Sequence, residues 1–132
     1  MKFTKMHSLG NDYVCINGFS ETVSTPGKLA KAICDRHFGV GADGLLLIFP
    51  SDKADFKMEL YNADGSRAQM CGNGIRCLGK YVYEHRMTDR QTLEIETISG
   101  LHTLQLYHSQ GIVELIKADM GIPCLDARRI PI

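Results

Sequence analysis

The chain has 132 residues, 44% of them hydrophobic, which fits one globular domain rather than a disordered segment. Fifteen basic residues balance fifteen acidic ones without a basic run, so we expect no nucleic-acid partner. No apolar stretch approaches the ~20 residues of a membrane span, and the N-terminus lacks a signal-peptide core, so we expect no membrane partner and a cytoplasmic location.

The first elements are two strands and a helix. Residues 1–7 and 13–17 have the composition of strands and are joined by a turn. Thr25 followed by Pro26 indicates a helix start, with Thr25 as the cap and Pro26 at the first helical position. This helix should end near Gly39.

Strands and one further helix follow. The apolar run 45–49 predicts a strand buried on both faces, and residues 56–61 alternate as a half-buried strand does. A helix is expected over 71–85, with one apolar stripe. Three strands joined by tight turns complete the pattern, at 93–97, 101–108 and 112–118.

The tally of about seven strands and two helices predicts an α+β fold, a curved and mostly antiparallel sheet wrapped around a central helix. The helix over 71–85 is the best candidate for the central one, because its glycines permit close backbone approach. These glycines are Gly72, Gly74 and Gly79.

Three kinds of site are disfavoured. Residues 39–44 match G-x-G-x-x-G, but a helix precedes and a strand follows, the reverse of the dinucleotide-binding order; we expect a loop with positive φ instead. No metal site is expected, because no C-x-x-C occurs and Cys71 and Cys77 face different directions on a helix. No G-x-S-x-G elbow supports serine catalysis.

Cys71 lies where the chain enters the second helix. The free N–H groups of Gly72, Asn73 and Gly74 and the positive end of the helix dipole point at this position. A thiol in such a position ionises more readily, and the same N–H groups can bind a carboxylate. The arrangement can therefore remove a proton α to a carboxylate.

The alternative is that Cys71 is a packing residue, as most cysteines are. We assign that packing role to the other four cysteines, Cys15, Cys34, Cys77 and Cys124. An odd number of widely spaced cysteines argues against a disulfide framework.

Four separated segments resemble diaminopimelate epimerase, a member of the two-cysteine racemase superfamily that works without pyridoxal phosphate. They occur in the family's order and run through nearly the whole chain. They are KMHSLGNDYV at 5–14, DRHFGVGADGLLLI at 35–48, YNADGSRAQMCGNGIRC at 61–77 and MGIP at 120–123.

The resemblance implies a two-domain isomerase with its active site between the domains and with no cofactor and no metal. Two cysteines, one per domain, act as thiolate base and thiol acid on opposite sides of the substrate α-carbon. The implied reaction interconverts LL- and meso-diaminopimelate for lysine and cell-wall synthesis. Inversion needs two groups, because a single base returns the proton to the face that it left.

By position, the resemblance implies that Cys71 is one acid/base residue. Gly72 and Asn73 would bind the reacting carboxylate through their backbone N–H groups, and Asn11 and Asn62 would hold the distal end of the substrate. The alternative for Asn11 and Asn62 is a role as turn-forming residues, because both border turns.

We therefore expect residues 1–119 to form the N-terminal epimerase domain and residues 120–132 to lead toward a second domain. The second thiol lies outside this chain, so we expect the chain alone to be inactive. An open sheet edge would favour a homodimer. The chain departs from the resemblance at Ser8, where the family usually has glycine, and at Gly44, where some members have a polar side chain. These two positions leave the details of the distal substrate site undetermined.

Two alternatives remain. One is another two-cysteine racemase acting on proline, hydroxyproline or histidine; Asn11 and Asn62 favour a substrate with a polar far end. The other is a non-catalytic binding or assembly domain, in which Cys71 would react as an ordinary thiol.

Overall fold

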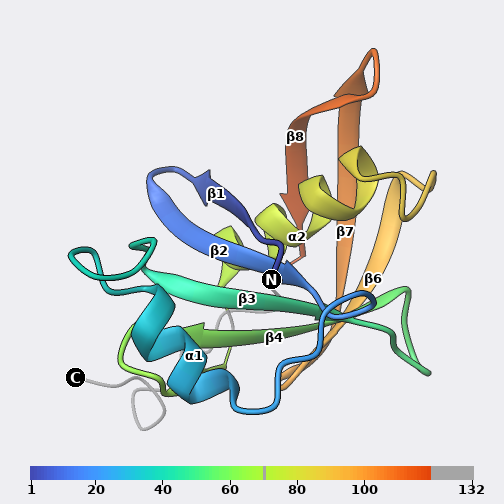
Figure 1. Cartoon of the computed structure of the whole chain (residues 1–132). Helices are drawn as coiled ribbons and strands as arrows, with labels where there is room; N and C mark the ends of the chain where they lie inside the picture. Colours follow the sequence, from blue (N-terminus) through green and yellow to red (C-terminus); the bar gives the residue numbers. More distant parts are fainter. Residues whose placement is uncertain (70, 120–132) are drawn as a thin grey trace, which may run out of the picture.

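The computed structural model describes residues 1–69 and 71–119 of the chain, which form one curved sheet and two helices (Figure 1). The helices are α1 (Pro26–Ile33) and α2 (Gly72–Glu84). The strands are β1 (Thr4–Ser8), β2 (Asn11–Asn17), β3 (Gly44–Phe49), β4 (Phe56–Asn62), β5 (Arg67–Ala68), β6 (Thr92–Thr97), β7 (Gly100–Ser109) and β8 (Ile112–Ala118).

The sheet is mostly antiparallel, as the sequence predicts. Its strand order is β1-β2-β3-β4-β6-β7-β8, and β5 pairs with β4 outside this path. The pairs β2–β3 and β4–β6 are parallel, whereas the other pairs are antiparallel. Figure 1 shows α2 in the hollow of the curled sheet and α1 on the opposite side, beside β3 and β4. The predicted α+β class is confirmed.

All seven predicted strands and both helices occur, with two differences. The two-residue strand β5 was not predicted, because two residues are too few for an alternating pattern to emerge. The helix α1 ends at Ile33, before Gly39. The cause lies in Asp35, whose carboxylate accepts the backbone N–H groups of His37 and Phe38 at 2.8 and 2.9 Å and so offers them an alternative to helical bonding.

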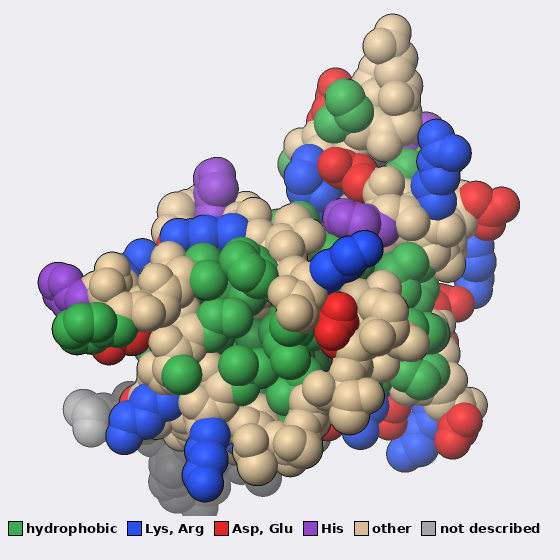
Figure 2. All heavy atoms as spheres, viewed as in Figure 1, with side chains coloured by type: hydrophobic (Ala, Val, Ile, Leu, Met, Phe, Trp, Pro, Cys, Tyr) green, Lys and Arg blue, Asp and Glu red, His purple; other side chains and the backbone are tan. Residues whose placement is uncertain are grey.

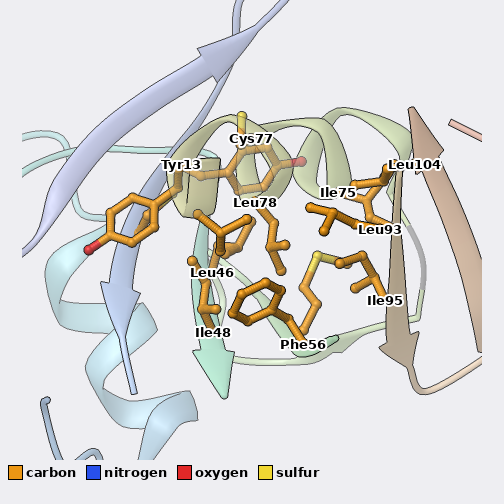
Figure 3. Close-up of a cluster of buried hydrophobic side chains, with 14 of the residues drawn as sticks. Tyr13, Leu46, Ile48, Phe56, Ile75, Cys77, Leu78, Leu93, Ile95 and Leu104 are labelled. Atoms are coloured by element: carbon orange, nitrogen blue, oxygen red, sulfur yellow. The ribbon is translucent and has the colours of Figure 1, made fainter. Parts of the chain in front are cut away.

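The main core lies between α2 and the concave face of the sheet (Figure 3). Ile75, Leu78 and Val82 form the predicted apolar stripe of α2 and are fully buried. The predicted close approach also occurs: a Cβ atom at Gly79 would lie 3.0 Å from the Leu104 side chain. The central helix is thus fixed against β7 by packing that admits no larger residue without movement.

The strand β3 is buried on both faces, as predicted. Leu46 and Ile48 join the core beneath α2, whereas Leu45 and Leu47 pack in a second cluster that includes Ala30 of α1. On the face seen in Figure 2, basic and acidic side chains are interspersed around an apolar area near β3 and α1. Neither helix in the described part of the chain is long and apolar enough to cross a membrane.

The loop before β3 and the buried cysteines also match expectation. Gly41 has a φ of 85°, so the loop over residues 39–44 contains the predicted positive φ. Cys15, Cys34 and Cys77 are buried, in keeping with the packing role assigned to them. Cys124 and the predicted linker over 120–132 lie outside the described residues.

Candidate functional site

Cys71 is the N-cap residue of α2 and is partly buried. Its backbone is extended, with φ −140° and ψ 118°, and the first helical hydrogen bond runs from the Ile75 N–H to the Cys71 carbonyl at 3.0 Å. The N–H groups of Gly72, Asn73 and Gly74 therefore precede the helical ladder. The cysteine lies at the helix start, as the sequence predicts.

Two side chains of β2 surround the Cys71 sulfur. The Tyr13 hydroxyl lies 2.8 Å from Sγ, and the Asn11 amide nitrogen lies 3.7 Å from it. The same amide donates a hydrogen bond to the Tyr13 hydroxyl at 2.9 Å. Cys71, Tyr13 and Asn11 thus form one polar cluster, and the Asn11 side chain points at the thiol.

The hairpin of β1 and β2 is also joined to the first turn of α2. The Ser8 hydroxyl donates to the Asn73 side-chain carbonyl at 3.2 Å. Ser8, a position where the resemblance implied glycine, uses its hydroxyl in this contact. The structure therefore brings Asn11, Cys71 and Asn73 together.

Asn62 has a different set of contacts. Its side-chain amide donates to the Ser66 hydroxyl at 3.0 Å, and its backbone N–H donates to the Ser66 carbonyl at 2.8 Å. These bonds belong to the turn between β4 and β5. In the sheet, however, Asn62 pairs with Gly44, and Gly44 pairs with Tyr13, so the three residues share one row.

A charged cluster lies near the turn end of the β1–β2 hairpin. The Arg36 guanidinium binds both oxygens of Asp12, at 2.9 and 3.2 Å, and also reaches Asp43 at 3.2 Å. Lys5 lies 3.3 Å from the same Asp12 carboxylate. The Arg36 guanidinium beside Asp12 holds the pKa of that carboxyl far below its ordinary value. The loop over 39–44 is thus tied to the strand that carries Asn11 and Tyr13.

Tyr13 is the site residue that the sequence reasoning missed. Its side chain is buried, and burial, followed by the neighbouring Cys71, raises the pKa of the phenol far above its ordinary value. The sequence held part of the signal: residues two apart in a strand share a face, and Tyr13 is two residues after Asn11.

A groove of about 410 Å³ lies between the two edge strands, β1 and β8, above α2. Its lining combines apolar and charged side chains, among them Leu9, Lys80, Glu114 and Leu115. Cys71 is not one of the lining residues. Within residues 1–69 and 71–119, no three His, Cys, Asp or Glu side chains gather as a metal site would need.

Solved structures with the same fold are distant in sequence. A hydroxyproline epimerase from Agrobacterium vitis matches with a TM-score of 0.71 and 14% identity, over 88% of this chain and 40% of that one. A probable proline racemase from Agrobacterium radiobacter K84 matches with a TM-score of 0.73 and 14% identity, over the same shares. These likenesses establish the fold alone.

The sequence comparisons identify the family. Diaminopimelate epimerase of Methanococcus maripaludis is 54% identical over 132 residues, which are 100% of this chain and 48% of that protein. The diaminopimelate epimerase of Acetivibrio thermocellus is 53% identical, over 100% of this chain and 47% of that protein. The chain spans about half the length of these relatives. The family profile described as diaminopimelate epimerase matches residues 3–125, and the chain belongs to that family.

Proposed function

We propose that this chain is the N-terminal half of a cofactor-independent epimerase that interconverts LL- and meso-diaminopimelate, with Cys71 as one of its two acid/base residues. The observation that carries this proposal is the position of Cys71 as the N-cap of α2, next to the residues of the first helical turn. Family membership and about 54% identity to an epimerase of this specificity support the choice of substrate.

The chemistry follows from that position. The substrate α-carboxylate binds to the N–H groups of Gly72 and Asn73, where the helix dipole favours an anion. The Cys71 thiolate takes the α-proton and becomes a thiol, and the electron pair of the C–H bond is left on the α-carbon and its carboxylate. Hydrogen bonds to the carboxylate stabilise this negative charge. A second thiol, on the opposite face, then returns a proton to the α-carbon with inverted configuration.

Asn11 and Asn62 are assigned to polar groups of the substrate, Asn11 near the reacting carbon and Asn62 at the distal end, which changes for Asn11 the expectation that the resemblance gave. Asn11 lies at the thiol, and its amide is positioned to bind a polar group close to the reacting carbon. Asn62 lies in the same row of the sheet as Tyr13, two strands away, which suits contact with the far end of a long substrate. In this arrangement the Asn62 side chain contacts both Ser66 in its own turn and the substrate.

The second thiol belongs to the part of the protein that this chain does not include, because the relatives are about twice as long. The groove between β1 and β8 is the surface that we assign to that part. Both strands are sheet edges, and unpaired edges favour further strand pairing. A homodimer that uses the same edges stays a prediction.

The test uses a joined protein, in which residues 1–132 are followed by the C-terminal half of the Methanococcus maripaludis relative. We expect the joined protein to convert LL-diaminopimelate to the meso form, and the chain alone to give no turnover above background. Chiral chromatography of the products measures both. Proline, hydroxyproline and histidine serve as competing substrates, and a preference of the joined protein for one of them would overturn the proposed specificity.

A further inference from the structure

We propose that Tyr13 is a positioning residue for Cys71, whose phenolic O–H donates a hydrogen bond to the sulfur and so favours its thiolate form. This inference deepens the proposed function and rests on the role of Cys71 in proton transfer. It assigns a role to Tyr13, whose hydroxyl oxygen lies 2.8 Å from the Cys71 sulfur.

Either atom of the Tyr13–Cys71 contact could be the donor, but a thiolate has no proton and can only accept. This direction is compatible with the contact that Tyr13 makes with Asn11. The Asn11 amide nitrogen can only donate, and it donates to the Tyr13 oxygen at 2.9 Å. The phenol oxygen therefore accepts from Asn11, and its own proton is free to point at Sγ of Cys71. The chain of donors runs from the amide to the phenol and from the phenol to the sulfur, with a longer contact of 3.7 Å from the amide to the sulfur itself.

The tyrosine ring is held in place by its surroundings. Only 4% of Tyr13 is exposed, and the ring packs over Gly44 on the neighbouring strand. A Cβ atom at position 44 would lie 2.8 Å from the Tyr61 carbonyl oxygen and 3.1 and 3.2 Å from two ring carbons of Tyr13. Gly44 therefore leaves space both for the Tyr13 ring and for the Tyr61 carbonyl of the neighbouring strand β4.

The phenol is suited to donate rather than to act as a base. Burial, and then Cys71, raise the pKa of Tyr13, so the phenol keeps its proton and can donate it in a hydrogen bond. An O–H bond to a thiolate is charge-assisted and stronger than one to a neutral thiol. Two titratable groups that interact with Cys71 are Tyr13 on β2 and the buried Cys77 on α2.

The experiment measures alkylation of Cys71 by iodoacetamide as a function of pH, in this chain and without substrate, by mass spectrometry of the peptide that contains the cysteine. The variant Tyr13→Phe keeps the ring and removes the hydroxyl. We expect the midpoint of its alkylation profile to rise by about one pH unit, a tenfold change in the thiol–thiolate equilibrium. The control is Tyr61→Phe, which removes a hydroxyl that donates to Glu59; its midpoint should equal that of the wild type.

Thermal unfolding of each variant shows whether it is folded. An unchanged or lower midpoint in folded Tyr13→Phe would overturn the inference. If Tyr13→Phe does not fold, replacement of all five tyrosines by 3-fluorotyrosine decides, because fluorine makes the phenol a stronger donor. We then expect the midpoint to fall, and a midpoint that stays or rises would contradict the proposal.

The outcome is separate from that of the proposed function. A raised midpoint in Tyr13→Phe supports the hydrogen bond even if the joined protein shows no epimerisation. Conversely, an active joined protein with an unchanged midpoint in Tyr13→Phe would retain the proposed function and remove the role of Tyr13.

Discussion

Asp12 connects the hairpin that carries Asn11 and Tyr13 to the loop before β3. Its carboxylate accepts two hydrogen bonds from Arg36 and one from the Asp43 N–H, and it lies in range of Lys5. Because these cationic side chains and this backbone N–H all bind the Asp12 carboxylate, we expect the position of Asn11 and Tyr13 on β2 to depend on an ionised Asp12.

This dependence predicts how stability changes with pH. The pKa of Asp12 is lowered in the folded chain, chiefly by Arg36, from an ordinary value of 3.8. Because its pKa is lowered, the ionised Asp12 carboxylate stabilises the fold. This contribution is complete above pH 3.8 and is lost as the pH falls further. We expect Asp12→Asn to unfold about 1 kcal/mol more easily at pH 7 and to lose less stability than the wild type below pH 3.8.

Urea unfolding between pH 7 and pH 3 measures both effects. The matched control is Asp52→Asn, since Asp52 is exposed and lies in the bend after β3. An acid profile of Asp12→Asn that runs parallel to the profile of Asp52→Asn would contradict this account.

The sequence located part of the site, for physical reasons that differ from residue to residue. Cys71 was predictable because a glycine-rich helix start has its own sequence pattern, and the cysteine is indeed the N-cap of α2. Tyr13 was not singled out, because strand alternation tells which face a side chain takes but not which helix end that face meets. Its contact with the sulfur depends on how the whole sheet curls around α2.

At the scale of elements, α2 determines where the thiol lies, because the helix is fixed by its buried stripe. Leu78, at the centre of the stripe, is fully buried between the helix and the sheet. We expect Leu78→Ala to lower the free energy of unfolding by about 2–5 kcal/mol, through lost transfer energy and a residual cavity. Leu115→Ala, at an exposed position on β8, should change it by less than about 0.5 kcal/mol. Equal losses in urea unfolding would show that α2 is not the core element.

The elements themselves were largely predictable from periodicity. The alternating runs of β4 and β6 and the apolar run of β3 each match the burial that the structure gives them. The end of α1 was not predictable from periodicity. Asp35 competes for the backbone N–H groups of two following residues, and apolar spacing does not encode this local contact.

At the scale of the whole molecule, the curled sheet of the described residues has β1 and β8 at its two edges, one on either side of α2, and each is paired on one side. The groove between them combines apolar and charged side chains, including the exposed Leu9 and Leu115. The family resemblance implied an open sheet edge, whereas sequence patterns predict only the strands. They do not predict which strands become the edges, since strand order depends on the pairing of distant segments.

The central claim is that Cys71 transfers the α-proton, and replacing its sulfur tests this most directly. The measurement is the rate of deuterium incorporation at the α-carbon of LL-diaminopimelate in D₂O, catalysed by the joined protein. We predict that Cys71→Ser slows this rate by about 100- to 10,000-fold, as expected for loss of an acid/base group. The control variant, Cys34→Ser, changes a cysteine buried near α1 and should leave the rate nearly unchanged. A Cys71→Ser rate equal to that of Cys34→Ser would contradict the account.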